Sequence, residues 1–162
     1  MTLVSRLAAA ALAVAMLFAP ISPAWAGDAE KAFLSKFVGT WTGGGTMTGA
    51  SSGKITCKLV FKSNGAKVNY TGRCTVPDVP SQSLSGSLSY NDAKKQYEVR
   101  SRGKTSVARR VGNTLTFTLV SRTPKGKATT TMSFSPVTIT AEAVVTESNG
   151  KTTNTRMSLS KS

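Results

Sequence analysis

Phe37-Val38-Gly39-Thr40-Trp41-Thr42-Gly43-Gly44-Gly45 is the stretch that decides the fold. It contains Trp41, one of only two tryptophans in the 162 residues. From Val38 onward apolar and polar residues alternate with a period of two, which is typical of β-strands. The run of three glycines predicts a bend in the first strand, of the kind that a small barrel needs for its curvature.

Alternation is clearest on either side of the turn Ser63-Asn64-Gly65, where Asn and Gly tolerate positive φ. The strand over 54–62 places Cys57 on its apolar face, and the return strand over 67–76 does the same for Cys74. The chain has no other cysteines. The two therefore lie opposite one another or one diagonal step apart, and we predict an internal Cys57–Cys74 disulfide. Closing this loop is worth about 3 kcal/mol in the chain-entropy model.

Similar alternating segments, joined by short turns, continue to the C-terminus and predict an all-β fold of about 8–10 strands. Nearly every connection has the length of a hairpin, which favours a single up-and-down antiparallel β-barrel; a β-sandwich is the alternative. Residues 27–36 predict a short N-terminal helix, because Ala29, Ala32 and Phe33 recur at helical spacing after the capping residue Asp28.

Residues 1–26 are predicted to be a cleavable signal peptide. Arg6 precedes an uncharged apolar run of 13 residues, Leu7 to Ala19, and Ala24-Trp25-Ala26 fits a small-x-small cleavage site. The run is short for a membrane span, which needs about 20 residues. No cysteine follows it directly, so we do not expect a lipoprotein. Removing 26 of the 162 residues leaves one domain, 27–162, and we expect it in the periplasm or secreted.

Gly39-x-Trp41 at the start of the first strand, together with the strand pattern, resembles the calycins: lipocalins, fatty-acid-binding proteins and nitrobindin-like proteins. The resemblance implies a lipocalin-like barrel in which the tryptophan closes one end beneath a basic residue of the last strand. Arg156 is the residue that we assign to this position, and Lys161 is the alternative. Nitrobindin-like proteins bind haem through a histidine, and this chain has none. We therefore expect no cofactor by that route.

Composition excludes several kinds of chemistry. Without histidine the chain lacks the commonest general base and metal ligand, and no pair of its seven acidic residues is predicted to face one cleft. We expect neither a catalytic site nor a metal site. The net charge of +14 falls to +13 when Arg6 is removed with the signal peptide, and it favours anionic partners, including an anionic envelope surface.

A barrel of ten strands is usually wide enough for an internal cavity, although a packed interior without a ligand is the alternative. One residue of the predicted inward set is charged: Arg109 is in phase with Val107 and Val111, and a register shift of one residue would turn Arg110 inward instead. The predicted ligand-binding residues are Tyr70, Tyr90, Tyr97, Arg109, Phe117 and Phe134.

These features favour a non-enzymatic carrier of a small apolar or anionic ligand. A second hypothesis is a protein-binding module such as a secreted-protease inhibitor, which would insert its N-terminal arm into the protease. A third is a polyanion-binding protein, since half of the basic residues after position 26 lie between Lys94 and Lys127. Nucleic acid is not the expected partner, because aromatic residues are not interleaved with the basic ones.

Overall fold

A computed structural model of the chain describes residues 26–76 and 79–162. The predicted signal peptide lies outside these residues except for Ala26, which begins the first helix. Among the described residues, no helix is long and apolar enough to cross a membrane.

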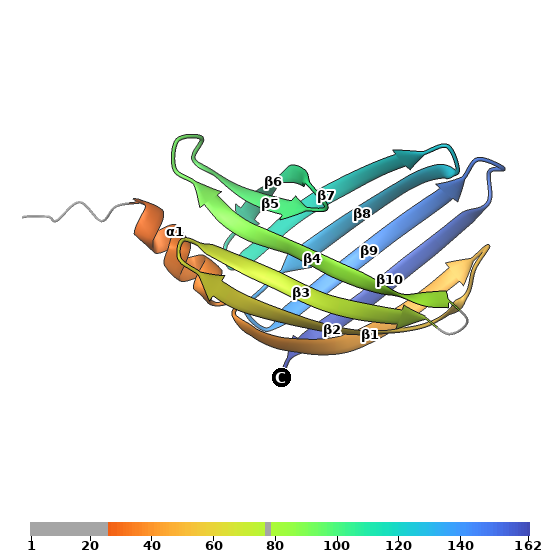
Figure 1. Cartoon of the computed structure of the whole chain (residues 1–162), viewed down its shortest axis with the longest axis horizontal. Coiled ribbons are helices and arrows are strands. Elements are labelled where there is room, and N and C mark those ends of the chain that lie inside the picture. Colours follow the sequence, from red (N-terminus) through yellow and green to blue (C-terminus); the bar gives the residue numbers. More distant parts are fainter. Residues whose placement is uncertain (1–25, 77–78) are drawn as a thin grey trace, which may run out of the picture.

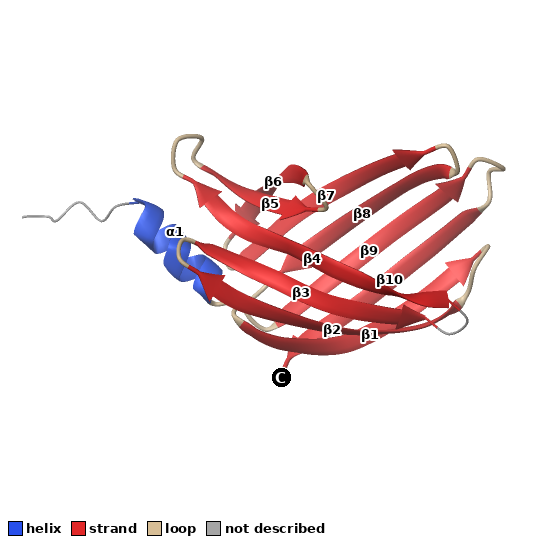
Figure 2. Ribbon diagram, in the orientation of Figure 1, coloured by secondary structure: helices blue, strands red, loops and turns tan. Residues whose placement is uncertain are grey.

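The described residues form one helix and ten strands (Figures 1 and 2). Every strand pairs antiparallel with its neighbours in the sequence, and β1 pairs with β10 to close the barrel. This arrangement confirms the predicted up-and-down barrel with a short N-terminal helix, and the sandwich alternative is wrong. The elements are α1 (Ala26–Ser35), β1 (Gly39–Gly49), β2 (Gly53–Asn64), β3 (Lys67–Val76), β4 (Val79–Asn91), β5 (Gln96–Ser101), β6 (Lys104–Val111), β7 (Thr114–Thr123), β8 (Gly126–Phe134), β9 (Thr138–Glu147) and β10 (Thr152–Lys161).

The apolar residues of the two-residue repeat face the barrel interior, and the polar residues between them face outward. Along β2 the residues Ile55, Cys57, Leu59 and Phe61 are buried and the intervening lysines are exposed. Cys57 pairs directly with Cys74 on β3, and the two form the predicted disulfide. The β2–β3 turn depends on Gly65, whose φ of 59° is unfavourable for other residues.

Closure of the barrel depends on the glycines of β1. A Cβ at Gly43 would overlap the carbonyl oxygen of Ser158, and one at Gly45 would overlap that of Arg156. Both glycines face inward, in phase with Trp41, so the backbones of β1 and β10 approach more closely than side chains would allow. The glycine run therefore supplies the curvature that the sequence predicts.

One junction in the wall is much shorter than the others. Only Arg109–Val111 of β6 pairs with Thr114–Thr116 of β7, whereas β7 continues alongside β8 as far as Thr123. The β5–β6 hairpin also ends at Ser101–Lys104, part of the way along β4. Beyond Thr116 the two strands diverge, and this leaves a wedge between β6 and β7 on the upper side of the barrel in Figure 1.

Candidate functional site

Helix α1 closes one end of the barrel interior. Its apolar residues Phe33 and Leu34, and Phe37 just beyond it, are at most 2% exposed. The Phe37 carbonyl accepts a hydrogen bond of 2.9 Å from the indole Nε1 of Trp41, which is fully buried. The helix and the first strand are thereby joined at the residue that the sequence singles out, and this end of the barrel is a packed core.

The basic residue beside Trp41 is Lys161, and the assignment of Arg156 to this position is wrong. Lys161 pairs with Trp41 across β1 and β10, and its Nζ lies 5.7 Å from the indole ring while donating to the Lys36 carbonyl at 3.0 Å. Arg156 lies an odd number of residues from Lys161, so it projects from the outer face, where it contacts Glu142 at 3.4 Å. Gly39 (φ 141°) makes room for the Lys161 stem, since a Cβ there would lie 2.6 Å from Cε.

Aromatic rings fill the barrel next to the helix. Phe117 stacks on Phe134 with centroids 5.5 Å apart, Phe61 stacks on Tyr70 at 5.3 Å, and Phe61 also meets the edge of Phe134 at 6.0 Å. Tyr97 packs against Phe33 of the helix. Four of the predicted ligand-binding residues therefore lie inside the barrel as predicted: Tyr70, Tyr97, Phe117 and Phe134. They pack against other aromatic rings of the core and form a floor instead of a cavity wall.

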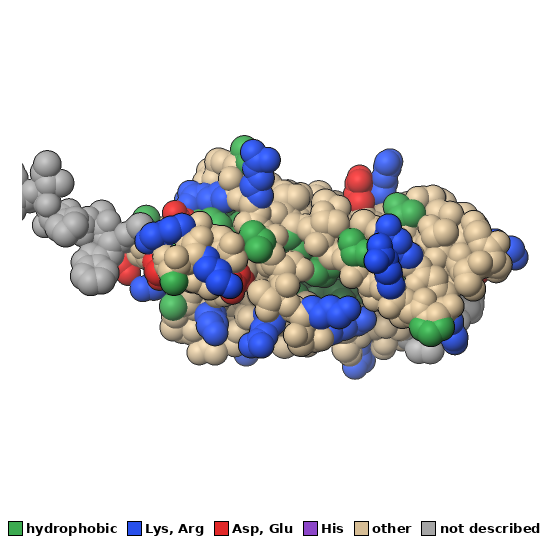
Figure 3. Space-filling model, turned by 90° about the horizontal axis from the view of Figure 1, so that it is seen from above, with side chains coloured by type: hydrophobic (Ala, Val, Ile, Leu, Met, Phe, Trp, Pro, Cys, Tyr) green, Lys and Arg blue, Asp and Glu red, His purple; other side chains and the backbone are tan. Residues whose placement is uncertain are grey.

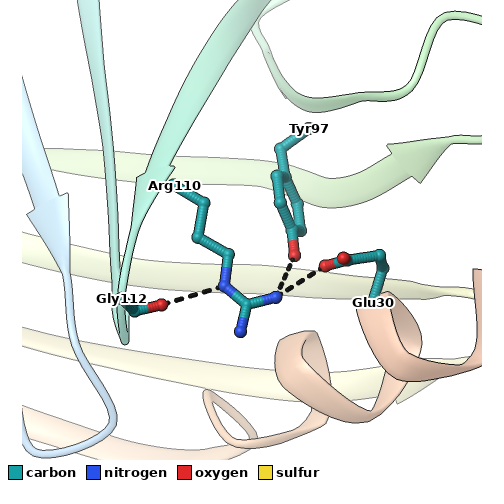
Figure 4. A network of polar contacts seen from close by, with 4 residues as sticks. All are labelled: Glu30, Tyr97, Arg110 and Gly112. Atoms are coloured by element: carbon teal, nitrogen blue, oxygen red, sulfur yellow. Dashed lines mark hydrogen bonds and ion pairs between the residues drawn. The ribbon is translucent and has the colours of Figure 1, made fainter. Parts of the chain in front are cut away.

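Arg110, and not Arg109, is the arginine of β6 that turns inward. The Gly112-Asn113 turn sets a register in which Arg110 pairs with buried Leu115, so Arg109 is exposed on the outer face and its predicted inward orientation is wrong. The Arg110 guanidinium donates to Tyr97 Oη at 2.9 Å, to Glu30 Oε2 at 2.7 Å and to the Gly112 carbonyl at 2.9 Å (Figure 4). Its Cζ also lies 3.8 Å from the centre of the Phe33 ring.

This network ties α1 to the barrel wall, and it supplies the anion that an inward arginine requires. Glu30 of the helix satisfies Arg110, so no ligand carboxylate is needed there. Sequence reasoning missed Glu30 because 80 residues separate it from Arg110. Beside the network a pocket of 620 Å³ opens on the surface, and Tyr90, half-buried with its ring 5.1 Å from Tyr97, lines it together with the outward-facing Arg109.

Away from the helix the interior changes in character. Met157 faces Gly45 on one side and Ala141 on the other, and Met132 flanks Ala141 from the opposite side. Met47 lies one inward position further from the helix on β1. All three methionines that follow residue 26 thus point into the barrel on this side of the aromatic floor, and all are partly buried. Met132 adjoins the floor, because it pairs with Phe117. Apolar side chains that are partly exposed and flexible can adapt to a ligand.

The inner wall of this half is completed by small and sulfur-containing residues. The Sγ atom of Cys57 in the disulfide lies 3.6 Å from Met157 Sδ. At the rim a pocket of 490 Å³ is lined by Ser121, Ala128, Val145 and Glu147 together with residues of the β7–β8 turn. No element among residues 26–76 and 79–162 covers this end in the way that α1 covers the other (Figure 1).

A polar group interrupts the apolar wall near the wedge. The Tyr70 ring lies over Gly86, and its hydroxyl interacts with the Ser101 side chain. Burial raises the pKa of Tyr70, while Ser101 and the charge of Arg102 act in the opposite direction. From above, hydrophobic atoms lie at the bottom of a recess with Lys and Arg side chains on its margins (Figure 3). The interior is therefore accessible from this side and is bordered by positive charge.

Among the described residues, no group of three or more His, Cys, Asp or Glu side chains could hold a metal ion. No protein-family model matches the chain, and no curated protein matches it. Solved structures do match. The S-type phycobiliprotein lyase CPES from Guillardia theta superposes with a TM-score of 0.58 at 12% identity, covering 82% of this chain and 92% of the lyase.

Two further solved structures are similar over most of the chain. The zebrafish ileal bile acid-binding protein complexed with cholic acid has a TM-score of 0.35 at 15% identity, covering 79% of this chain and 100% of that one. The redesigned β-barrel mFAP0 bound to DFHBI has a TM-score of 0.39 at 17% identity, covering 78% and 99%. With its closed ten-stranded wall, helix plug and Trp41 packing, the chain has a calycin-like barrel fold, as its sequence predicts.

Proposed function

We propose that the chain is an exported, non-enzymatic binding protein that holds a small apolar molecule with an acidic group in the half of the barrel away from α1. The observation that carries the proposal is the division of the interior. Side chains beside the helix are aromatic and buried, whereas the far half is lined by partly buried Met47, Met132 and Met157. Ligand sites in barrels are concave, mostly apolar and edged by a few polar groups.

The positive charge around the accessible interior supports the proposal that the ligand carries an acidic group. Arg102 lies near the Tyr70 hydroxyl at one edge of the accessible interior, and Lys125 and Lys127 line the pocket at the rim. One carboxylate, Glu147, lines the same pocket and partly offsets their charge. An anionic group at the mouth, with the apolar body directed toward the aromatic floor, matches this distribution.

The protease-inhibitor hypothesis requires a free N-terminal arm. Phe33 and Leu34 of that segment are buried in the barrel, and Glu30 is bonded to Arg110, so residues 27–36 are held by the fold. Withdrawing them would expose the closed end of the core. The geometry therefore favours ligand binding over inhibition by an inserted arm.

The test is a titration with anilinonaphthalene sulfonate, an apolar fluorescent anion, followed by energy transfer from Trp41. Ala143 lies on the inner face of β9 in the far half, and its neighbour Val144 lies on the outer face and is 43% exposed. Ala143→Trp should fill the site and weaken binding at least about tenfold, and Val144→Trp should leave it within about twofold, since neighbouring strand residues face opposite sides.

Urea denaturation of both variants checks that the barrel is intact, and Ala143→Leu provides a smaller filling residue if the tryptophan does not fold. Equal affinity for the two tryptophan variants would place the probe on the outside and contradict the proposal. Export is tested separately by mass spectrometry of the protein from intact cells, which should begin at Gly27. A retained Met1 or a lipid adduct would contradict that part.

A further inference from the structure

The wedge between β6 and β7 presents two strand edges that have no partner among residues 26–76 and 79–162. Residues 104–108 of β6 pair with β5 but have no partner on β7, and residues 117–123 of β7 pair with β8 but have none on β6. Such edges expose rows of backbone donors and acceptors and are templates for an added strand. Natural edges are usually protected by bulges, prolines or covering loops, and β7 reaches Thr123 before Pro124.

Exposed valines flank the same wedge. Val107 on β6 is 59% exposed, and Val120 on β7 is 49% exposed. Both project from the outer face, one on each side of the gap. A strand placed between them would cover both side chains, as neighbouring side chains on one face of a sheet do. The unpaired backbone and the exposed apolar side chains therefore indicate the same kind of occupant.

Charge identifies the chemistry of that occupant. No acidic residue occurs between Glu98 and Glu142, and this interval contains eight basic residues. Those around the wedge that are exposed are Arg102, Lys104, Arg109, Arg122, Lys125 and Lys127. The carboxylates near the wedge already have partners. Glu98, which pairs with Val107 across β5 and β6, accepts hydrogen bonds from the Asn91 and Gln96 side chains. Glu30 binds Arg110, and Glu147, which pairs with Gly126, accepts a hydrogen bond from Asn149.

We propose that an extended acidic segment of another protein binds as an added β-strand in the wedge between β6 and β7. Its backbone would pair with the free edges, its outward apolar residues would cover Val107 and Val120, and its carboxylates would meet the surrounding cations. A second copy of this chain fits less well, because each copy carries a large positive net charge, +14 for all 162 residues, and the same cations border the wedge in both. The proposal does not depend on a ligand inside the barrel.

The probe is a fluorescein-labelled nine-residue peptide with threonine at every second position and valine and glutamate in turn at the positions between, so that both can face outward in the added strand. Fluorescence anisotropy is the readout. Two control peptides separate the contributions. One replaces glutamate by lysine, and the other carries N-methyl groups on alternate residues, which removes backbone donors while keeping the charge. We expect only the unmodified acidic peptide to bind, and we expect its binding to slow hydrogen exchange at residues 104–108 and 117–123.

Matched charge reversals locate the site. Arg109→Glu with Arg122→Glu changes one cation on each side of the wedge, whereas Lys58→Glu with Arg73→Glu makes the same change in net charge at a directly opposed pair on the outer face of β2 and β3. The first pair should weaken binding at least about tenfold, and the second should weaken it less than about threefold.

Three results would overturn the proposal. Equal losses of peptide affinity in the two double variants would mean that binding depends only on the net charge of the protein. Undiminished binding of the N-methylated peptide would exclude strand addition. A dimer that forms without peptide in sedimentation, and in which hydrogen exchange at residues 117–123 is slowed, would make a second copy the occupant. Hydrogen exchange of the unbound variants shows whether each retains its barrel.

Discussion

The two halves of the barrel interior share the same ten strands but differ in how their side chains are packed. Beside α1, Trp41 and its aromatic neighbours are fully buried and make several ring contacts. In the far half, partly buried methionines face a rim without a covering element among the described residues. A closed barrel wall thus does not by itself decide whether the interior is core or binding site. What occupies each end decides it.

The largest expected effect is the loss of an aromatic ring from the closed half. Trp41→Ala should lower the free energy of unfolding by about 3–5 kcal/mol, because the neighbouring rings cannot close around the cavity. Met47→Ala in the far half should cost only about 1 kcal/mol, since Met47 is already partly exposed. Urea denaturation measures both. Similar losses for the two substitutions would mean that the halves are equally packed.

The disulfide joins β2 and β3 at the boundary between the halves. Replacing both cysteines, Cys57→Ala with Cys74→Ala, should lower the unfolding free energy by about 3 kcal/mol, mainly because the unfolded chain regains the entropy of an 18-residue loop. The urea midpoint should fall, and reduction of the wild-type protein should reproduce the shift. Two reactive thiols in denatured, unreduced protein exported from cells would show that the bond does not form.

Two ion pairs of the chain allow a partly buried pair to be compared with an exposed pair. Arg110 and Glu30 at the helix have side chains 32% and 23% exposed, whereas Arg156 and Glu142 on the outer face are 81% and 66% exposed. Double-mutant cycles with alanine should give a coupling of about 1 kcal/mol for the first pair and about 0–0.5 kcal/mol for the second. Equal couplings would contradict a specific role for Arg110 in holding the helix.

The smallest expected effect concerns the cation beside Trp41. Lys161→Met should lower the unfolding free energy by about 0.5–1 kcal/mol, because it removes a cation near the ring and the bond to the Lys36 carbonyl. Arg156→Met, its counterpart on the outer face, should change it by less than about 0.5 kcal/mol. A larger effect at Arg156 would restore the arginine as the residue that closes the barrel.

Most of the fold was predictable because successive side chains of a strand point to opposite faces of the sheet. This alternation alone separates the residues that face the barrel interior from those that face outward. The Cys57–Cys74 disulfide followed from the same repeat and from one recognisable turn. The errors at Arg109 and Arg156 concern the direction of single side chains, because a shift of one residue along a strand exchanges the inner and outer faces. In β6 the repeat is ambiguous, since Val107 and Val111 are exposed and Ala108 is buried. Only the pairing with β7 settles it.

The division of the interior could not be predicted from the strand pattern. Phe117 and Phe134 are aromatic residues of the kind that line ligand sites. They instead form part of the packed floor, because Phe37 packs against Phe134 from the helix side. Contacts of this kind join segments far apart in the sequence. The wedge likewise depends on where β6 leaves β7, and the residues of both strands are compatible with continued pairing.

Methionine methyl groups report most directly on the central claim that the far half of the interior accepts a ligand while the closed half does not. After residue 26 the chain has three methionines, Met47, Met132 and Met157, and all line the far half. We predict that titrating methyl-labelled protein with anilinonaphthalene sulfonate shifts all three methionine methyl resonances in NMR spectra and leaves those of Leu88 and Ile139, which are fully buried, nearly unchanged. Shifts at Leu88 and Ile139 with unmoved methionines would contradict it.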